Sequence, residues 1–175
     1  PLRPSDAVGA KQPEHLLTPQ QRGHAMPIGE LCNREVVFAT RKTGIIEAAQ
    51  LMRQYHVGDL VVVDEIAGRR VPVGMITDRD MVVELLAQSR PVEGCTVGEV
   101  MRPQLITVPE TAGVVATIRL MRAHGIRRIP VVDAEGGLAG IMSVDDMLDL
   151  LAEEMAELAR VAPRAQSREA RLRAG

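Results

Sequence analysis

The chain has 175 residues, of which 46% are hydrophobic, and its formal net charge is −2 at pH 7. It contains one Phe, one Tyr and no Trp, so its core must be built from aliphatic side chains and Met. No apolar run approaches the ~18 residues of a membrane helix, so we expect no membrane span. The near-neutral charge and the scarcity of aromatic rings argue against a nucleic-acid surface.

Residues 1–25 precede the first periodic apolar pattern of the chain. They contain several Pro and Gly residues and lack the apolar centre of a signal peptide. We expect them to be either a disordered leader or residues upstream of a natural start at Met26.

The cysteines and histidines show no pattern of a redox or metal site. Cys32 and Cys95 lie far apart, and the four His residues form no metal-binding spacing with them or with one another. This usage predicts reduced thiols in a cytoplasmic protein, without a bound metal.

An internal repeat organises most of the chain. A shift of 69 residues places Val62–Asp64 on Val131–Asp133. Beyond an insertion within residues 65–71, a shift of 66 places Asp80 on Asp146. One constant shift with one short insertion indicates a duplicated unit.

The repeat defines the expected domain boundaries. Repeat 1 is assigned to residues 26–90 and repeat 2 to residues 91–158. The Arg-rich segment 159–175 is predicted to be a basic tail, which is either a solvated end or a contact for an acidic partner.

Repeat 1 shows a helix, a hairpin and a second helix in chain order. Apolar residues have helical spacing over Thr43–Tyr55, and the apolar run Leu60–Val63 favours a strand buried on both faces. A turn over residues 65–70 leads to a second strand, Val71–Ile76. Asp78–Gln88 then has helical spacing, with acids in the first turn that suit the helix dipole.

Repeat 2 follows the same order, with helices over 112–124 and 144–160 and strands over 129–133 and 138–142. Each repeat is a β-α-β-β-α unit of about 60 residues, which is small for a core of its own. We therefore expect an α/β fold in which two sheets pack face to face with helices outside, as a pseudo-twofold pair with two clefts. The last helix keeps its apolar spacing beyond the repeat, and this extension covers either its own module or a partner subunit.

Two aligned segments, 74–80 and 140–146, share the order Gly, two apolar residues, Thr or Ser, two variable residues and Asp. In a structural reading, the hydroxyls of Thr77 and Ser143 cap helices that carry an acid in the first turn. In a functional reading, free N–H groups at the same corner bind a phosphate, and the Asp accepts hydrogen bonds from ribose hydroxyls. The sequence is compatible with both readings.

These features resemble a tandem pair of CBS domains (a Bateman module), the repeat named after cystathionine β-synthase. The resemblance covers about residues 28–155 and rests on the duplication, the paired motifs and the segment His124–Asp133. It implies a regulatory module rather than an enzyme, and it implies a homodimer. The implied effectors are adenosine-containing ligands such as AMP, ADP, ATP or S-adenosylmethionine, bound between the repeats without a required cofactor.

The resemblance also implies roles for the two motifs. Asp80 and Asp146 would hold ribose hydroxyls, and Thr77 and Ser143 would lie near phosphate or ribose.

Other positions follow from the same resemblance. The backbone at Val57–Gly58 and at Ile126–Arg127 would meet the edges of adenine. Arg128 matches a position that contacts phosphates, and Thr111 is a further candidate before the first helix of repeat 2.

The two repeats differ where phosphate binding is implied. Repeat 2 has Arg127–Arg128 where repeat 1 has Gly58–Asp59. Because a carboxylate repels phosphate and Arg forms charge-assisted bonds with it, we predict unequal clefts. The cleft that uses Asp146 with Ser143 and Arg128 is expected to prefer phosphorylated nucleotides. The cleft that uses Asp80 with Thr77 is expected to be empty, weaker or selective for a less anionic adenosyl ligand.

Three functions are compatible with the sequence to different degrees. The leading hypothesis is a cytoplasmic adenine-nucleotide sensor that acts on another, unidentified protein by changing shape. The alternative is a ligand-free dimerisation or scaffold module, in which the Asp residues only cap helices. An enzyme fits least, because the sequence shows no nucleophile motif, metal cluster or acid–base pair.

Overall fold

The structure, a computed structural model, describes residues 26–161, 163, 164 and 173. It contains two three-stranded sheets with the strand orders β1-β2-β3 and β4-β5-β6. The strands are β1 (Phe38–Thr40), β2 (Asp59–Ile66), β3 (Arg69–Thr77), β4 (Val108–Pro109), β5 (Arg128–Val132) and β6 (Leu138–Ser143). The first pair in each sheet is parallel and the second is antiparallel. The predicted leader and most of the predicted basic tail lie outside the described residues.

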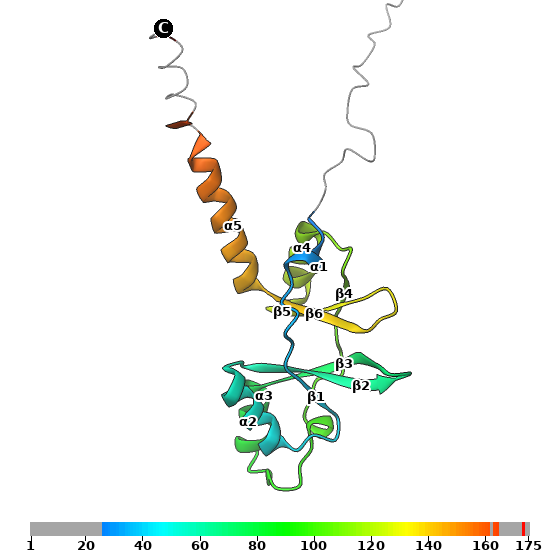
Figure 1. Ribbon diagram of the computed structural model, residues 1–175. Helices are drawn as coiled ribbons and strands as arrows, with labels where there is room; N and C mark the ends of the chain where they lie inside the picture. The colour runs from blue at the N-terminus through cyan, green and yellow to red at the C-terminus, as the bar shows by residue number, and fades with distance from the viewer. Residues whose placement is uncertain (1–25, 162, 165–172, 174–175) are drawn as a thin grey trace, which may run out of the picture.

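Helices cover the outer faces of the two sheets, which lie face to face (Figure 1). The helical segments are α1 (Ile28–Leu31), α2 (Ile45–Tyr55), α3 (Asp78–Met81), η1 (Val82–Leu86), η2 (Val97–Glu99), α4 (Val114–His124) and α5 (Val144–Ala159). Strands β3 and β6, one from each sheet, are in contact. The expected α/β architecture of two like units packed through their sheets is therefore confirmed.

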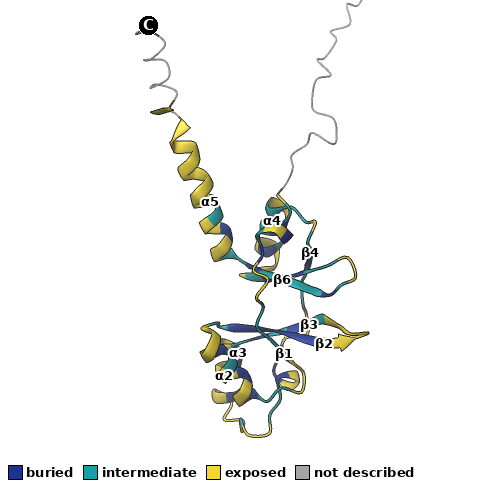
Figure 2. Cartoon of the chain, in the orientation of Figure 1, coloured by how far each residue is buried: buried dark blue, intermediate teal, exposed yellow. Residues whose placement is uncertain are grey.

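Strand β2 lies at the centre of the first sheet and is buried over its first five residues, as Figure 2 shows. Leu60, Val61 and Val62 are 0% exposed, which confirms the prediction of a strand covered on both faces. The hairpin to β3 turns at Ala67 and Gly68, whose φ angles are 50° and 76°. Two residues with positive φ form a tight turn whose twist matches the strands, so both strands extend further than the apolar pattern predicts.

The second helix of repeat 1 differs from the single helix predicted over Asp78–Gln88. Helix α3 passes into η1, a π-helical segment in which the Ala87 N–H donates to the Val82 carbonyl at 2.8 Å. Met81 and Leu85 are still buried, at 9% and 0% exposure. Because the wider turn keeps Met81 and Leu85 on the core side, the apolar spacing does not distinguish the π-helical segment from an α-helix.

The leading segment of each repeat packs on the other repeat. Near α1, the Ile28 N–H donates to the Ala112 carbonyl at 2.7 Å, and Ile28 belongs to the core around β5. Near η2, the Val97 N–H donates to the Thr43 carbonyl at 2.8 Å, and Val97 belongs to the core around β2. Each core is therefore completed by a segment of the other repeat, which makes the pair a single folding unit.

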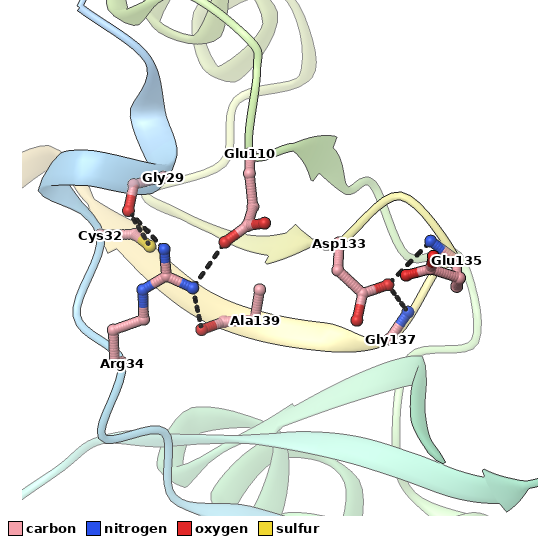
Figure 3. Close-up of polar contacts among 8 residues, drawn as sticks. All are labelled: Gly29, Cys32, Arg34, Glu110, Asp133, Glu135, Gly137 and Ala139. Carbon is pink, nitrogen blue, oxygen red and sulfur yellow. Dashed lines mark hydrogen bonds and ion pairs between the residues drawn. The ribbon is translucent and has the colours of Figure 1, made fainter.

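Arg34 fastens the leading segment of repeat 1 to repeat 2, as Figure 3 shows. Its Nη2 donates to the Gly29 carbonyl at 2.7 Å. Its Nη1 donates to the Glu110 carboxylate and, at 3.4 Å, to the Ala139 carbonyl. The guanidinium thus links α1, the approach to α4 and strand β6.

Helix α5 extends away from the sheets beyond its first turns (Figure 1). Its buried residue is Met147, whereas Leu151, Met155 and Leu158 are 45%, 69% and 70% exposed. The extension therefore does not cover its own module, and its packing on a partner subunit stays a prediction. None of the helices in the described part of the chain has the length and apolarity needed to cross a membrane.

Candidate functional site

A cleft of about 460 Å³ opens between the two repeats. One wall comes from the start of β2, the end of β3 and the start of α3, and the other from the start of β5. Lining residues between Arg102 and Ile106, in the segment that follows η2, close the remaining side. The lining residues are Gly58, Asp59, Met75, Thr77, Asp78, Arg79, Asp80, Arg102, Gln104, Leu105, Ile106, Gly125, Ile126, Arg127 and Arg128.

The repeat 1 motif forms a capping box at the edge of this cleft. The Thr77 Oγ1 accepts the Asp80 N–H at 3.0 Å and donates to the Asp80 Oδ2 at 2.7 Å. The Thr77 N–H donates to the same oxygen at 3.0 Å. The predicted structural role of the motif is therefore present, and Asp80 is only 3% exposed.

The second oxygen of Asp80 binds a residue that the sequence reasoning did not name. The Arg102 Nε–H donates to the Asp80 Oδ1 at 2.9 Å, and the Arg102 Nη2 lies 2.7 Å from the same oxygen in an ion pair. Arg102 lies in the leading segment of repeat 2, where its N–H donates to the Met75 carbonyl of repeat 1 at 3.0 Å. Its proximity to Asp80 depends on the crossing of the leading segments, so no local motif signals it.

A second ion pair crosses the cleft from one repeat to the other. The Arg128 Nε lies 3.0 Å from the Asp59 Oδ1, and the Asp59 side chain is 5% exposed. Burial raises the pKa of the Asp59 carboxyl, the Arg128 guanidinium acts in the opposite direction, and the nearby Asp78 raises it further. Desolvation thus outweighs the ion pair, so Asp59 ionises less readily in the folded chain than in the unfolded chain.

Arg127 forms a longer ion pair than Arg102 and Arg128 do. Its Nη2 lies 3.5 Å from the Asp145 Oδ1, and both side chains are largely exposed. Its carbonyl accepts the Val144 N–H at 2.9 Å, as the Gly58 carbonyl accepts the Asp78 N–H at 3.0 Å in repeat 1. The starts of β5 and β2 are thereby fixed to the first turns of α5 and α3.

The repeat 2 motif has the same local geometry in a different place. The Ser143 Oγ donates to the Asp146 Oδ2 at 2.6 Å and accepts the Asp146 N–H at 3.1 Å. Asp146 is exposed and lines a separate hollow of about 240 Å³, together with Asp149 and Glu153. The lining of the larger cleft does not include Ser143 or Asp146.

The cleft therefore combines the predicted residues differently from the grouping expected from the sequence. Arg128, expected to act with Asp146, lines the cleft of Thr77 and Asp80. The reason is the pseudo-twofold packing, which brings the start of β5 in one repeat against the β3–α3 corner of the other. The Asp80 cleft therefore contains Arg102, Arg127 and Arg128 beside Asp59, and the specificity expected for it stays a prediction.

The other predicted positions divide between the cleft and its surroundings. Gly58, Ile126 and Arg127 line the cleft. Val57 packs against the core of repeat 1, and Thr111 is exposed in the turn before α4. In the part of the chain that the structure describes, no three His, Cys, Asp or Glu side chains are grouped to hold a metal ion.

Known proteins share both the repeats and the fold. CBS domain matches cover residues 28–87 and 97–153. The uncharacterized protein MK0525 of Methanopyrus kandleri is 32% identical over 126 residues, which are 72% of this chain and 63% of that protein. The chain thus matches less than two thirds of the length of that relative.

A shorter relative and a solved structure are matched over more of their length. The CBS domain-containing protein YhcV of Bacillus subtilis is 39% identical over 114 residues, which are 65% of this chain and 76% of YhcV. The CBS domain pair of protein MJ0100, solved in complex with 5′-methylthioadenosine and S-adenosyl-L-methionine, is 26% identical. It superimposes with a TM-score of 0.63 over 73% of this chain and 97% of that chain. With two matched repeats, the predicted capping boxes and the same fold, this chain belongs to the CBS domain family.

Proposed function

We propose that the chain is a regulatory module that binds an adenosine-containing ligand, such as AMP, ADP, ATP or S-adenosylmethionine, in the cleft between its repeats. The observation that carries the proposal is the composition of this cleft. It unites the carboxylate of Asp80 from repeat 1 with Arg127 and Arg128 from repeat 2. A carboxylate suits ribose hydroxyls, and guanidinium groups suit phosphates.

The size and the apolar lining of the cleft support the same ligand class. A volume of about 460 Å³ is in the range of small-molecule sites. Met75, Leu105 and Ile126 supply aliphatic surface for a purine ring. Since the whole chain has one Phe and one Tyr, a base would be held by aliphatic contacts and backbone groups rather than by stacking on aromatic rings.

The complex of the MJ0100 domain pair with two adenosyl compounds supports an adenosine-type ligand for this chain as well. The ion pair of Arg128 with Asp59 joins the two repeats, so a ligand that disturbs it can change how the repeats are arranged. A phosphate that draws Arg128 away from Asp59 alters the contact between the repeats. Such a ligand acts on a partner protein only to the extent that it prefers one arrangement of the repeats.

Thermal unfolding of the full chain with AMP, ADP, ATP, S-adenosylmethionine and adenosine tests the proposal. A bound ligand at 100 times its Kd stabilises the folded state by about 2.7 kcal/mol. We expect Asp80→Asn to abolish the stabilisation and Asp146→Asn, the matched change in the other repeat, to retain it. If no compound stabilises the wild-type chain, the ligand-binding function is rejected.

A ligand-free dimerisation module is the second candidate, and helix α5 favours it. Leu148, Leu151, Met155 and Leu158 form an apolar stripe with helical spacing, and each is at least 45% exposed. Exposed stripes of this kind mark surfaces that bind another protein. A chain that dimerises through α5 but is stabilised by none of the five compounds fits this candidate instead.

A further inference from the structure

Both oxygens of the Asp80 carboxylate are already occupied by partners within the protein. Its Oδ2 receives the N–H and the hydroxyl of Thr77, at 3.0 and 2.7 Å. Its Oδ1 accepts the Arg102 Nε–H at 2.9 Å, and the Arg102 Nη2 lies 2.7 Å from the same oxygen in an ion pair. Because Asp80 is only 3% exposed and Arg102 occupies Oδ1, a ribose hydroxyl can donate to this oxygen only after the Arg102 guanidinium moves away.

Arg102 is the donor that is free to leave. The two donors of Thr77 belong to the cap of α3 and are fixed by the local backbone. The Arg102 side chain is 71% exposed, while its backbone is paired with Met75. The guanidinium can therefore move away from Asp80 by side-chain rotation, while the backbone of Arg102 stays paired with Met75.

Repeat 2 offers a comparison without this arginine. The bridges Met75↔Arg102 and Asn33↔Ile141 place Arg102 and Asn33 at equivalent points of the two sheets. The Asn33 Oδ1 accepts the Glu35 N–H at 2.8 Å. Within the described residues, the hydrogen bonds to the Asp146 carboxylate come from Ser143, so its second oxygen is open there.

We propose that Arg102 is a latch on Asp80 that selects for anionic ligands in this cleft; the proposal rests on the ligand-binding function above. A neutral nucleoside must break the Asp80–Arg102 ion pair and offers the freed guanidinium no replacement. A nucleotide breaks the same pair but offers its phosphate to Arg102, alongside Arg127 and Arg128 on the facing wall. The latch thereby penalises adenosine more than AMP.

Calorimetric titration of the full chain with adenosine and with AMP tests the latch. Wild type is expected to prefer AMP. Arg102→Asn, which installs the residue of the equivalent point in repeat 2, is expected to bind adenosine about tenfold more tightly and to lose most of the preference for AMP. Arg102→Lys keeps the charge without the two-point contact, so its preference is expected to lie between the two.

Arg41→Asn provides a matched control, because Arg41 forms an exposed ion pair with Asp64 away from the cleft. Its ratio of adenosine to AMP affinity is expected to equal that of wild type. The latch is overturned if Arg102→Asn leaves the wild-type ratio unchanged while both proteins bind AMP. If neither wild type nor Arg102→Asn binds adenosine or AMP, the ligand-binding function is rejected, and the latch with it. If Arg102→Asn binds adenosine and wild type does not, the result supports the latch.

Discussion

The Thr77–Asp80 corner of repeat 1 and the Ser143–Asp146 corner of repeat 2 have the same capping box and different surroundings. Asp80 is 3% exposed, is paired with Arg102 and lines the cleft between the repeats. Asp146 is exposed and borders a smaller, acidic hollow. The difference shows that the motif supplies a helix cap in both copies, whereas the neighbours from the other repeat decide whether the carboxylate can serve a ligand.

Asp59 and Arg128 extend this comparison, because the shift of 69 residues aligns them with each other. They meet across the pseudo-twofold axis at 3.0 Å. Two identical charged residues at equivalent positions repel each other at such an axis, whereas opposite charges attract. The difference between the repeats at this one position therefore makes the contact across the axis attractive.

The largest expected effect comes from breaking the Asp59–Arg128 pair. Arg128→Asp leaves two carboxylates together at a largely buried site, and we expect the free energy of unfolding to fall by about 2–3 kcal/mol. Asp59→Arg is expected to be destabilising as well, because it places two cations in contact. The double variant Asp59→Arg/Arg128→Asp restores opposite charges and is expected to recover most of the loss in urea unfolding.

The exposed pair Arg41–Asp64 is the matched control for this reversal, and its single reversals are expected to cost less than about 1 kcal/mol. If the double variant at Asp59 and Arg128 is no more stable than the less stable single variant, this pair does not stabilise the contact between the repeats by electrostatic attraction.

A smaller effect is expected when each corner loses its acid. Asp80→Asn breaks the cap and the ion pair with Arg102 at a buried site, so we expect it to lower the free energy of unfolding by about 2 kcal/mol. Asp146→Asn breaks only an exposed cap and is expected to cost about 1 kcal/mol or less. Chemical unfolding of both variants measures the difference, and equal losses contradict the unequal surroundings.

The smallest expected effect is a pH dependence at Asp59. Its pKa is raised in the folded chain by burial, so the folded state keeps a proton that the unfolded chain releases. Stability is therefore expected to decline as pH rises from the ordinary carboxyl range through the raised pKa, and to level off above it. Asp59→Asn lacks this decline, so subtracting its unfolding free energy from that of wild type isolates the effect. A difference that stays constant over this range contradicts the prediction.

Much of the fold could be predicted from the sequence because its signals are local. The apolar run at Leu60–Val63 and the helical spacing over Thr43–Tyr55 each depend on residues that are close together in the chain. The π-helical segment Val82–Leu86 was not predictable in this way, because the side chains that face the core have nearly the same spacing in both kinds of helix. The capping boxes at Thr77 and Ser143 are likewise local and were expected.

The candidate site was less predictable because its contacts are not local. Thr77 and Asp80 were named from the repeat 1 motif, and Ile126 and Arg128 from the family resemblance. Arg128 was grouped with Asp146, whereas in the structure it lines the cleft of Asp80. Arg102 belongs to no motif, and it reaches Asp80 only because the leading segment of repeat 2 crosses onto the sheet of repeat 1.

The sequence by itself determined the duplication, the order of strands and helices and the aliphatic character of the core. Its composition also determined that any bound base must be held with little aromatic contact. Only the tertiary structure decided which charges face one another, because the packing of the repeats joins residues from different repeats in both ion pairs, Asp80 with Arg102 and Asp59 with Arg128. Periodicity records which side of an element is apolar, whereas electrostatic partners depend on distance in space.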